Sequence, residues 1–565
     1  MNPRHRTSAF FAAVLLGLLF CSQPSRAAAA DLPLAAATLD DLFTRLAAHG
    51  FSGSVLITRH GETLLRKGYG LADRTTGSPV TAETVFSTGS ITKQLTATGI
   101  LRLEMDGKLS TGDRLGTFLP AIAKSVGLDL APGAVREDLA AVTLHQLLSH
   151  TSGIDNYYLD QFPSWKEYLA EILKQPLTAP PGTAFSYSNS NYDLLGMIIE
   201  AVSGVSYERY LHDHLFVPAG LRSTGFDLPA WRRDRIARYQ DWTTRKWPFP
   251  VAMPLDRPPG LRLCGSGEML STVDDLYKWH QALLGDRVLS AAARDKLFRP
   301  VLDSYAYGWY TGTTSRGTRV VFHGGFDTAL GTSAGFYRYL DDDVVLIFLA
   351  NTNMNRQLNK EIVASWVEAV LFGGEVPLPP ASLPAVPIPQ AARYTLPSGA
   401  GLDVSVQGGQ IVLATEDPAA MLLLSFPNAA AAEPLPEDEP MTRLFRGWWE
   451  QQKKDLGDLV SVRPAHMLSR DFEGEPELQV FLLVRFARGE HLVRAIRSSA
   501  GRVFFNVEKV PARLELILAP QGNNLYSAWS LRLQTATHIE ITPDAIIIHG
   551  RRDRTPATVA RRQEL

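Results

Sequence analysis

The sequence predicts an α+β protein in which an antiparallel sheet flanked by helices carries an inserted helical lobe, followed by a mostly β module. Strand-like segments lie near both ends of the first 375 residues, at about 52–70 and 305–350, and helical patterns fill the stretch between them. Six prolines occupy the 14 residues from Val376 to Pro389, which is typical of a linker. Beyond this stretch the pattern changes to short strands.

Four consecutive segments are expected along the 565 residues. They are a signal peptide at 1–30, an α+β domain at 31–375, a proline-rich linker at 376–390, and an accessory, mostly β module at 391–565. A chain of this length suits about two to four domains.

The first thirty residues have the order of features of a secretory signal peptide. Arg4 and Arg6 give a positive start, residues 9–20 are apolar, and the alanines at 28–30 suit a cleavage site. The apolar run is too short for a spanning helix, and no later stretch is long enough to cross a membrane. We therefore expect an exported protein, periplasmic or extracellular. Lipoprotein anchoring at Cys21 ranks second, because a bulky side chain precedes that cysteine.

The charge and cysteine content narrow the classes of partner and cofactor. Lys and Arg number 56 against 58 Asp and Glu, so no basic surplus points to nucleic acid. Cys21 and Cys264 are too few for a disulfide framework or a cysteine-based zinc site. We expect no metal and no organic cofactor, and a small-molecule or peptide substrate. The oligomeric state is left open.

The elements of the first domain follow from local patterns. Two strand-like runs around His60-Gly61 predict a hairpin, and Ser271-Thr272 followed by acidic residues is a strong helix start. The full expected order is helix 38–49, strands 52–59 and 62–70, helices 90–109, 144–148, 192–202 and 273–284, strands 305–311, 319–323, 332–339 and 344–350, and helix 358–371.

The C-terminal module is predicted from alternating patterns and one helical stretch. That helix carries Trp448 and Trp449, for which packing on a sheet is the default interpretation over a ligand pocket. The expected order is strands 402–406 and 410–414, helix 441–456, and strands 478–486, 491–497, 503–507, 513–518, 529–533 and 538–541.

The sharpest local feature is the run from Phe86 to Lys93, FSTGSITK. Ser90 is predicted where a loop becomes a helix, which puts Lys93, three residues on, on the same face. A serine hydroxyl becomes a nucleophile when a nearby base accepts its proton, and a desolvated lysine can assist. The N–H groups at a helix start can stabilise an oxyanion. A helix cap followed by a surface lysine is the competing interpretation.

A second candidate is Tyr187-Ser188-Asn189, directly before the helix predicted at 192–202. In extended backbone Tyr187 and Asn189 point the same way. A tyrosine near a lysine can shuttle a proton, and an asparagine amide can donate to and accept from a substrate. A packed loop tyrosine beside a turn is the alternative.

A third candidate, His323-Gly324-Gly325-Phe326, ends a predicted strand. Glycines there let a substrate approach the strand backbone, and a following N–H group can complete an oxyanion hole. An ordinary strand end is the alternative.

In this order the three stretches resemble the serine β-lactamase and penicillin-binding-protein superfamily. The resemblance is closest to the class C branch and its family VIII esterase, D-aminopeptidase and DD-carboxypeptidase relatives. The stretch Leu147–Gly153 and the one from Gly265 to Leu276 are similar to that family too. The resemblance covers about Leu42 to Phe372 and implies a β-lactamase-like fold for the first domain.

The resemblance also implies roles for the matched residues. Ser90 would be the acylated nucleophile, Lys93 its proton partner, and Tyr187 the general base and acid. The other implied roles are substrate binding by Asn189, His323 and Gly325, and an oxyanion hole from the backbone N–H groups of Ser90 and Phe326. The expected product of attack is an acyl-enzyme on Ser90, which is then hydrolysed or transferred.

His323 departs from the family pattern, which usually has a lysine there. An imidazole is mostly neutral at pH 7, so the anchor for a substrate carboxylate is weakened. This favours an esterase or peptidase over an efficient β-lactamase, without excluding weak β-lactam turnover. The alternative function is a non-catalytic or acyl-trapping protein of the same fold, whose C-terminal module binds a partner or cell-wall material.

Three other sites receive structural interpretations. His145 and His150 are expected to cap a helix or bond within the core rather than bind metal. Asp341-Asp342-Asp343 is expected to be a solvated hairpin turn rather than a calcium site.

Overall fold

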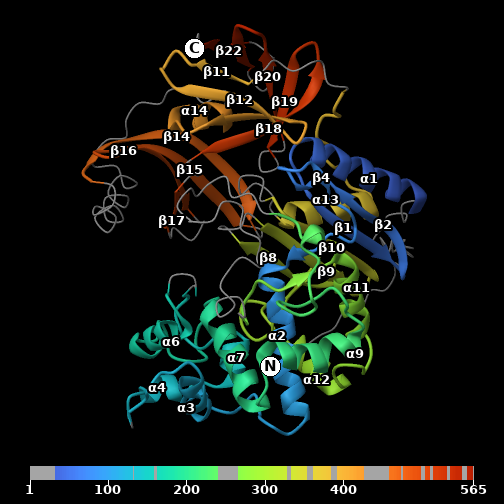
Figure 1. The fold of residues 1–565 in the computed structure, drawn as a ribbon, viewed down its shortest axis with the longest axis vertical. Helices are drawn as coiled ribbons and strands as arrows, with labels where there is room; N and C mark the ends of the chain where they lie inside the picture. The colour runs from blue at the N-terminus through green and yellow to red at the C-terminus, as the bar shows by residue number, and fades with distance from the viewer. Residues whose placement is uncertain are drawn as a thin grey trace, which may run out of the picture.

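In a computed structural model of the chain, a sheet with a helical lobe adjoins a β-barrel (Figure 1). The residues that the structure describes are 32–131, 133–157, 159, 162–238, 265–327, 332–352, 360–383, 391–425, 457–472, 475–497, 503–509, 513–530, 535–549 and 556–563. The expected signal peptide, both cysteines and the tryptophan-bearing helix expected at 441–456 lie outside these residues.

The first domain is built on a six-stranded antiparallel sheet with the order β2-β1-β10-β9-β8-β7. Its strands are β1 (Gly53–Arg59), β2 (Glu62–Tyr69), β7 (Tyr310–Thr313), β8 (Arg319–Asp327), β9 (Thr332–Tyr339) and β10 (Val344–Ala350). β1 pairs with β10 along its whole length, from Gly53 opposite Ala350 to Arg59 opposite Val344. Strands from both ends of the domain therefore complete one sheet, as predicted.

Side chains of these strands alternate between two hydrophobic cores. Val55 and Ile57 of β1 pack with the helices α1 (Leu32–Ala48) and α13 (Lys360–Phe372) on one face of the sheet. Leu56, between them, packs into the core of the helical lobe on the other face. The sheet is therefore covered on both sides.

The helical lobe surrounds α2 (Thr92–Met105), which is buried on nearly all sides and packs against α7 (Asn189–Ser203). Its other helices are α3 (Leu115–Ser125), α4 (Glu137–Ala140), α5 (Leu144–Leu148), α6 (Trp165–Lys174), α8 (Tyr207–Leu211), α9 (Val217–Ala219), α11 (Val273–Ala282) and α12 (Ala291–Leu297). Shorter elements are the helical turns η1 (Gly89–Ile91), η3 (His212–Phe216) and η4 (Arg233–Arg235) and the strand pairs β3 (Leu71–Asp73) with β4 (Ser78–Pro79) and β5 (Phe86–Ser87) with β6 (Leu270–Ser271). The predicted start of α11 is confirmed, because Thr272 Oγ1 accepts a hydrogen bond from the N–H of Asp275 at 3.2 Å.

The strand predicted from Tyr305 is wrong in its start, because β7 begins only at Tyr310. The chain turns between these residues: Gly308 has a φ of 76°, and the N–H of Ala306 donates to the carbonyl of Trp309 at 2.7 Å. Aromatic and apolar residues there are buried in the lobe core rather than in a strand.

The C-terminal module is mostly strands, as predicted, and contains a closed barrel in the order β11-β12-β13-β18-β19-β20-β21-β22. The barrel strands are β11 (Ala392–Thr395), β12 (Gly401–Gln407), β13 (Gln410–Thr415), β18 (Leu514–Gly522), β19 (Leu525–Ser530), β20 (Thr535–Ile541), β21 (Ala545–His549) and β22 (Pro556–Arg562). Between β13 and β18 lie α14 (Pro418–Ser425) and a sheet of β14 (Leu459–Phe472), β15 (Glu475–Phe486), β16 (Gly489–Arg497) and β17 (Val503–Lys509). Residues 529 and 530 of the strand expected at 529–533 belong to β19, and the rest of that prediction lies outside the described residues.

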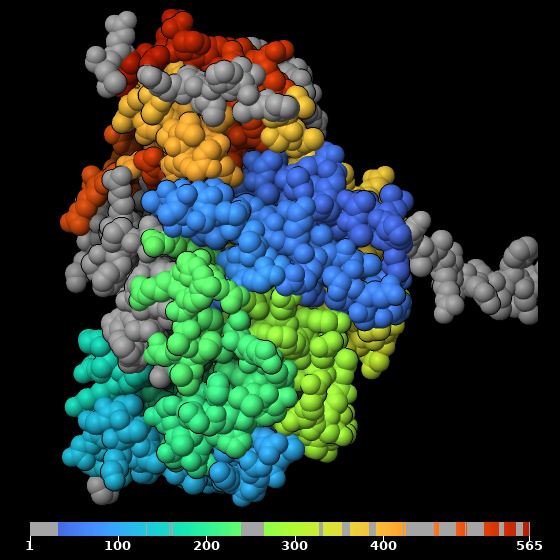
Figure 2. All heavy atoms as spheres, turned by 45° about the vertical axis from the view of Figure 1, so that its right-hand side comes forward, coloured from blue at the N-terminus to red at the C-terminus, as the bar shows by residue number. Residues whose placement is uncertain are grey.

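The barrel packs against the end of α1 and the segment after β2, and Figure 2 shows the gold-to-red module resting on the blue N-terminal segment. The His49 ring lies 6.4 Å from Trp529 of β19. Burial at this junction lowers the pKa of His49 to about 4, so its ring is neutral. Arg74 is buried there and is attracted by the buried carboxylate of Glu515.

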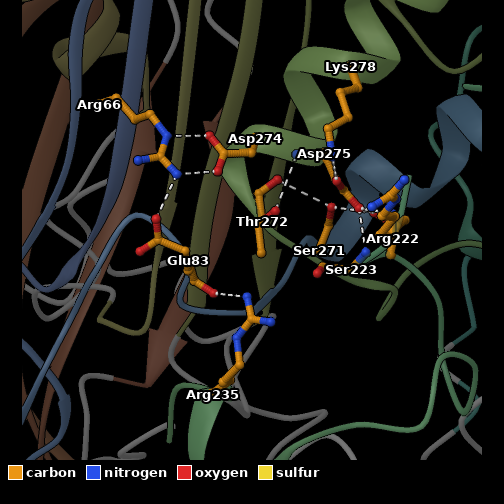
Figure 3. A network of polar contacts seen from close by, with 11 residues as sticks. Arg66, Glu83, Arg222, Ser223, Arg235, Ser271, Thr272, Asp274, Asp275 and Lys278 are labelled. Atoms are coloured by element: carbon orange, nitrogen blue, oxygen red, sulfur yellow. Dashed lines mark hydrogen bonds and ion pairs between the residues drawn. The ribbon is translucent and has the colours of Figure 1, made fainter. Parts of the chain in front are cut away.

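Two neighbouring aspartates connect α11 to its surroundings (Figure 3). Asp274 makes a two-pronged ion pair with Arg66 of β2, at 2.7 and 2.5 Å. Asp275 is buried and accepts the backbone N–H groups of Arg222 at 2.7 Å and Ser223 at 2.6 Å. One aspartate therefore makes a surface ion pair, whereas the other is buried and binds backbone donors and the ammonium group of Lys278, at 2.7 Å.

These two aspartates are expected to differ in their effect on stability. Asp275→Ala leaves these backbone donors and the ammonium group of Lys278 without their acceptor and should cost about 2–4 kcal/mol. Asp274→Ala removes an exposed pair and should cost at most about 1 kcal/mol. Thermal melting of the two variants measures this, and equal shifts in melting temperature would contradict it.

Candidate active site

Ser90 lies in η1, the turn that joins β5 to α2, as the sequence predicts. Thr88 anchors this turn, because both its N–H and its Oγ1 donate to the carbonyl of Met269, at 2.8 and 3.0 Å. Gly89 adopts a φ of 51°, in the left-handed region that glycine favours. Ser90 is only half-buried, whereas the residues on both sides of it are buried.

The ammonium group of Lys93 is buried and faces three neutral acceptors. It donates to Ser90 Oγ at 3.2 Å, to Asn189 Oδ1 at 2.7 Å and to the carbonyl of Ser266 at 2.6 Å. These acceptors match the three hydrogens of an ammonium group. The structure thus brings the predicted Ser90, Lys93 and Asn189 together, although Asn189 comes from the start of α7.

Tyr187 lies on the other side of the same ammonium group. Lys93 Nζ is 4.8 Å from the centroid of its ring, a cation–π distance. The ring also packs against His150 and Tyr305, with centroids 4.4 and 6.1 Å apart. The tyrosine and the asparagine of the predicted motif therefore both face Lys93.

The end of β8 touches η1 backbone to backbone. A Cβ atom at Gly325 would lie 2.0 Å from the carbonyl oxygen of Thr88, and one at Gly89 would lie 2.9 Å from the nitrogen of Phe326. Only glycine allows this approach. It brings the amide of Phe326 beside the turn that carries Ser90.

His323 is buried in β8 with both ring nitrogens near oxygens. Its Nδ1 lies 2.7 Å from the carbonyl of Gly324, which can only accept, so Nδ1 carries a proton. Its Nε2 lies 3.3 Å from the hydroxyl of Tyr305. A hydroxyl can donate or accept, so this contact suits Nε2 in either role.

Sequence reasoning missed Ser266 and Asp193, which support Lys93. Ser266 contributes a backbone carbonyl, for which side-chain identity gives no signal. Its N–H donates to the buried carboxylate of Asp193 at 3.0 Å. The other oxygen of Asp193 accepts the hydroxyl of Tyr168 at 2.7 Å. Asp193 lies four residues after Asn189 on α7, so a helical spacing to the asparagine was the available signal.

His145 and His150 make hydrogen bonds within the core, as expected. His145 Nδ1 lies 2.6 Å from the hydroxyl of Tyr307, and His150 Nδ1 lies 3.2 Å from the N–H of Ser188. The run Asp341–Asp343 joins β9 to β10 and forms ion pairs with arginines and a histidine. Within the described ranges, no group of three or more His, Cys, Asp or Glu residues suits a metal ion.

No helix among the described residues combines the length and apolar character needed to cross a bilayer.

Comparison with known proteins places the site in a family. A family model described as Beta-lactamase matches residues 39–366. PbpX of Bacillus subtilis (strain 168), named as a penicillin-binding protein, is 33% identical over 277 residues, which are 49% of this chain and 66% of PbpX. A second penicillin-binding protein of that strain is 28% identical over 402 residues, 65% of this chain and 84% of its own length.

A solved structure extends the likeness in fold. The octameric penicillin-binding protein homologue from Pyrococcus abyssi superposes with a TM-score of 0.52 at 20% identity. The match covers 85% of this chain and 99% of that one. It therefore includes residues beyond the family match.

Proposed function

Because the chain belongs to the β-lactamase family, we propose that it is an exported serine hydrolase that forms an acyl-enzyme on Ser90 and cleaves an ester or amide bond. One observation carries the proposal. The buried ammonium of Lys93 donates to Ser90 Oγ, and its nitrogen lies 4.8 Å from the centroid of the Tyr187 ring. The proposed nucleophile and its proton partners therefore lie next to one another.

Lys93 and Tyr187 divide the proton chemistry in this proposal. The ammonium of Lys93, next to the Tyr187 ring, favours the phenolate form of Tyr187. This phenolate accepts the hydroxyl proton of Ser90 as Oγ attacks the carbonyl carbon, and Lys93 orients that hydroxyl. The tyrosine then gives the proton to the leaving group, and the acyl group stays on Ser90.

The oxyanion of the tetrahedral intermediate needs preorganised donors. The backbone N–H groups of Ser90 and Phe326 are assigned this role, because β8 and η1 meet at Gly325 without an intervening side chain. Water then attacks the acyl-enzyme through a second intermediate in the same hole. Hydrolysis returns the proton to Ser90 Oγ and releases the acid.

The proposed substrate class depends on the side chains that would bind the substrate. Asn189 presents an amide next to Lys93, and an imidazole at His323 is not a permanent cation at pH 7, so neither supplies a fixed cation for a carboxylate. This supports an esterase or peptidase over an efficient β-lactamase. D-amino-acid and cell-wall-type substrates fall within the proposal, and weak β-lactam hydrolysis is compatible with it.

Replacing the proposed nucleophile gives the first test. A fluorophosphonate should add once to the mature protein, as seen by intact mass spectrometry, and the adduct should disappear in Ser90→Ala. Turnover of p-nitrophenyl esters should fall at least about 1,000-fold in the variant. Ser78→Ala, which removes an exposed hydroxyl on β4, is the matched control.

The outcomes separate the proposal from its alternative. Labelling without turnover would favour the acyl-trapping protein, in which the C-terminal module binds a partner or cell-wall material. Labelling that persists in Ser90→Ala would contradict the assignment of the nucleophile.

The close approach of β8 gives a second test. Gly325→Ala pushes the strand away from η1 and should slow fluorophosphonate labelling by about 100-fold, the cost of losing one oxyanion donor. Gly312→Ala on β7, where a Cβ would meet its nearest neighbour at 3.6 Å, should change the rate by less than about twofold. Equal rates for both variants would rule out an oxyanion donor at Phe326.

A further inference from the structure

We propose that His150 is a positioning residue that holds Tyr187 in place through its imidazole ring and its backbone carbonyl. The inference rests on the role proposed for Tyr187 and adds a residue that its three motifs do not contain. His150 lies just after α5, on a different element from Ser90, Lys93 and Tyr187.

The backbone and the ring of His150 bind the chain on both sides of Tyr187. The N–H of Ser186 donates to the carbonyl of His150 at 2.9 Å. The N–H of Ser188 donates to its Nδ1 at 3.2 Å. His150 therefore binds the Phe185–Ser186 peptide group and the Tyr187–Ser188 peptide group, which restrains the backbone that carries Tyr187.

The imidazole also packs on the tyrosine itself. His150 has none of its surface exposed, and its ring centroid lies 4.4 Å from that of Tyr187, 4.7 Å from Tyr305 and 5.0 Å from Tyr192. The ammonium of Lys93 lies 4.8 Å from the Tyr187 ring. The Tyr187 ring is thus held between a cluster of aromatic rings and the ammonium group of Lys93.

The hydrogen bonds define which tautomer His150 adopts. The N–H of Ser188 can only donate, so Nδ1 carries no proton. The Asn191 amide nitrogen also faces Nδ1, at 3.2 Å, while its oxygen accepts the hydroxyl of Ser152 at 2.7 Å. A proton on Nδ1 would face the N–H of Ser188 and the amide of Asn191, which are both donors, so it is disfavoured.

The surroundings of His150 keep the ring neutral. Burial, and then the nearby Lys93 and His323, hold its pKa well below the usual value. This direction favours the neutral ring, in which Nδ1 accepts hydrogen bonds.

The backbone conformation of His150 supports a role for its side chain. Its φ of 56° lies in the left-handed region, which is strained for most residues and free for glycine. A histidine at such a position has to be stabilised by its contacts. The contacts that do so here are the ones made to the Tyr187 segment and to Asn191.

This conformation also allows a clean experiment. His150→Gly removes the ring but suits the φ and keeps the carbonyl that binds Ser186. His150→Asn restores an acceptor near the place of Nδ1, and asparagine tolerates this φ. His60→Gly is the matched control, because His60 has a φ of 51° in the exposed turn between β1 and β2.

We expect His150→Gly to lower kcat for p-nitrophenyl ester hydrolysis by about 10–100-fold, with KM within about twofold, because misplacing a catalytic group affects the chemical step. His150→Asn should return kcat to within about fivefold of the parent, and His60→Gly should leave it unchanged. Circular dichroism checks that each variant folds. If the glycine variant does not fold, a loss above about 100-fold in folded His150→Asn overturns the inference.

A double-mutant cycle with Tyr187→Phe shows whether His150 acts through the tyrosine. If it does, His150→Gly costs less than about threefold in the Tyr187→Phe background. The same loss in both backgrounds, or no loss in the single variant, overturns the inference. Failure of the proposed function is distinct, since it shows as retained activity in Ser90→Ala or Tyr187→Phe alone.

Discussion

The site depends on one backbone contact, between the turn η1 and the end of β8. Each side of this contact is fixed by a different part of the domain. Thr88 holds η1 through the carbonyl of Met269, and the sheet holds β8 by pairing Gly325 with Ala334 of β9. The absence of a side chain at Gly325 lets the two backbones meet. The position of Ser90 against the strand therefore depends on the packing of the lobe on the sheet.

The second constraint is a buried ammonium group that donates hydrogen bonds to neutral oxygens. Removing an ammonium group from water is costly unless its hydrogen bonds are replaced, and the acceptors around Lys93 replace them. The carboxylate of Asp193 is one residue removed, since it binds the N–H of Ser266 while the carbonyl of Ser266 binds Lys93. The three acceptors fix the position of the ammonium group, and the carboxylate of Asp193 holds one of these acceptors, the Ser266 peptide, in place.

The parts of the site that sequence reasoning reached are those with local signals. Ser90 and Lys93 are three residues apart on one helical face, and β9 and β10 are buried runs whose bounds match the prediction. Ser266 acts through its backbone, and Tyr305 occurs in a strand-like run that long-range packing turns into a loop. In the C-terminal module, β14 contains Pro464 and several charges, so only its pairing with β15 reveals a strand.

The junction with the barrel uses other residues than those that surround Ser90. His49 Nε2 donates to the carbonyl of Pro380 at 3.2 Å, and the N–H of Leu383 donates to the carbonyl of Pro520 at 2.9 Å. The described part of the proline-rich stretch thus lies between α1 and the barrel. α1 covers the face of the sheet opposite the helical lobe, whereas Ser90 lies on the lobe side. These contacts fix the barrel without using the residues that position the nucleophile.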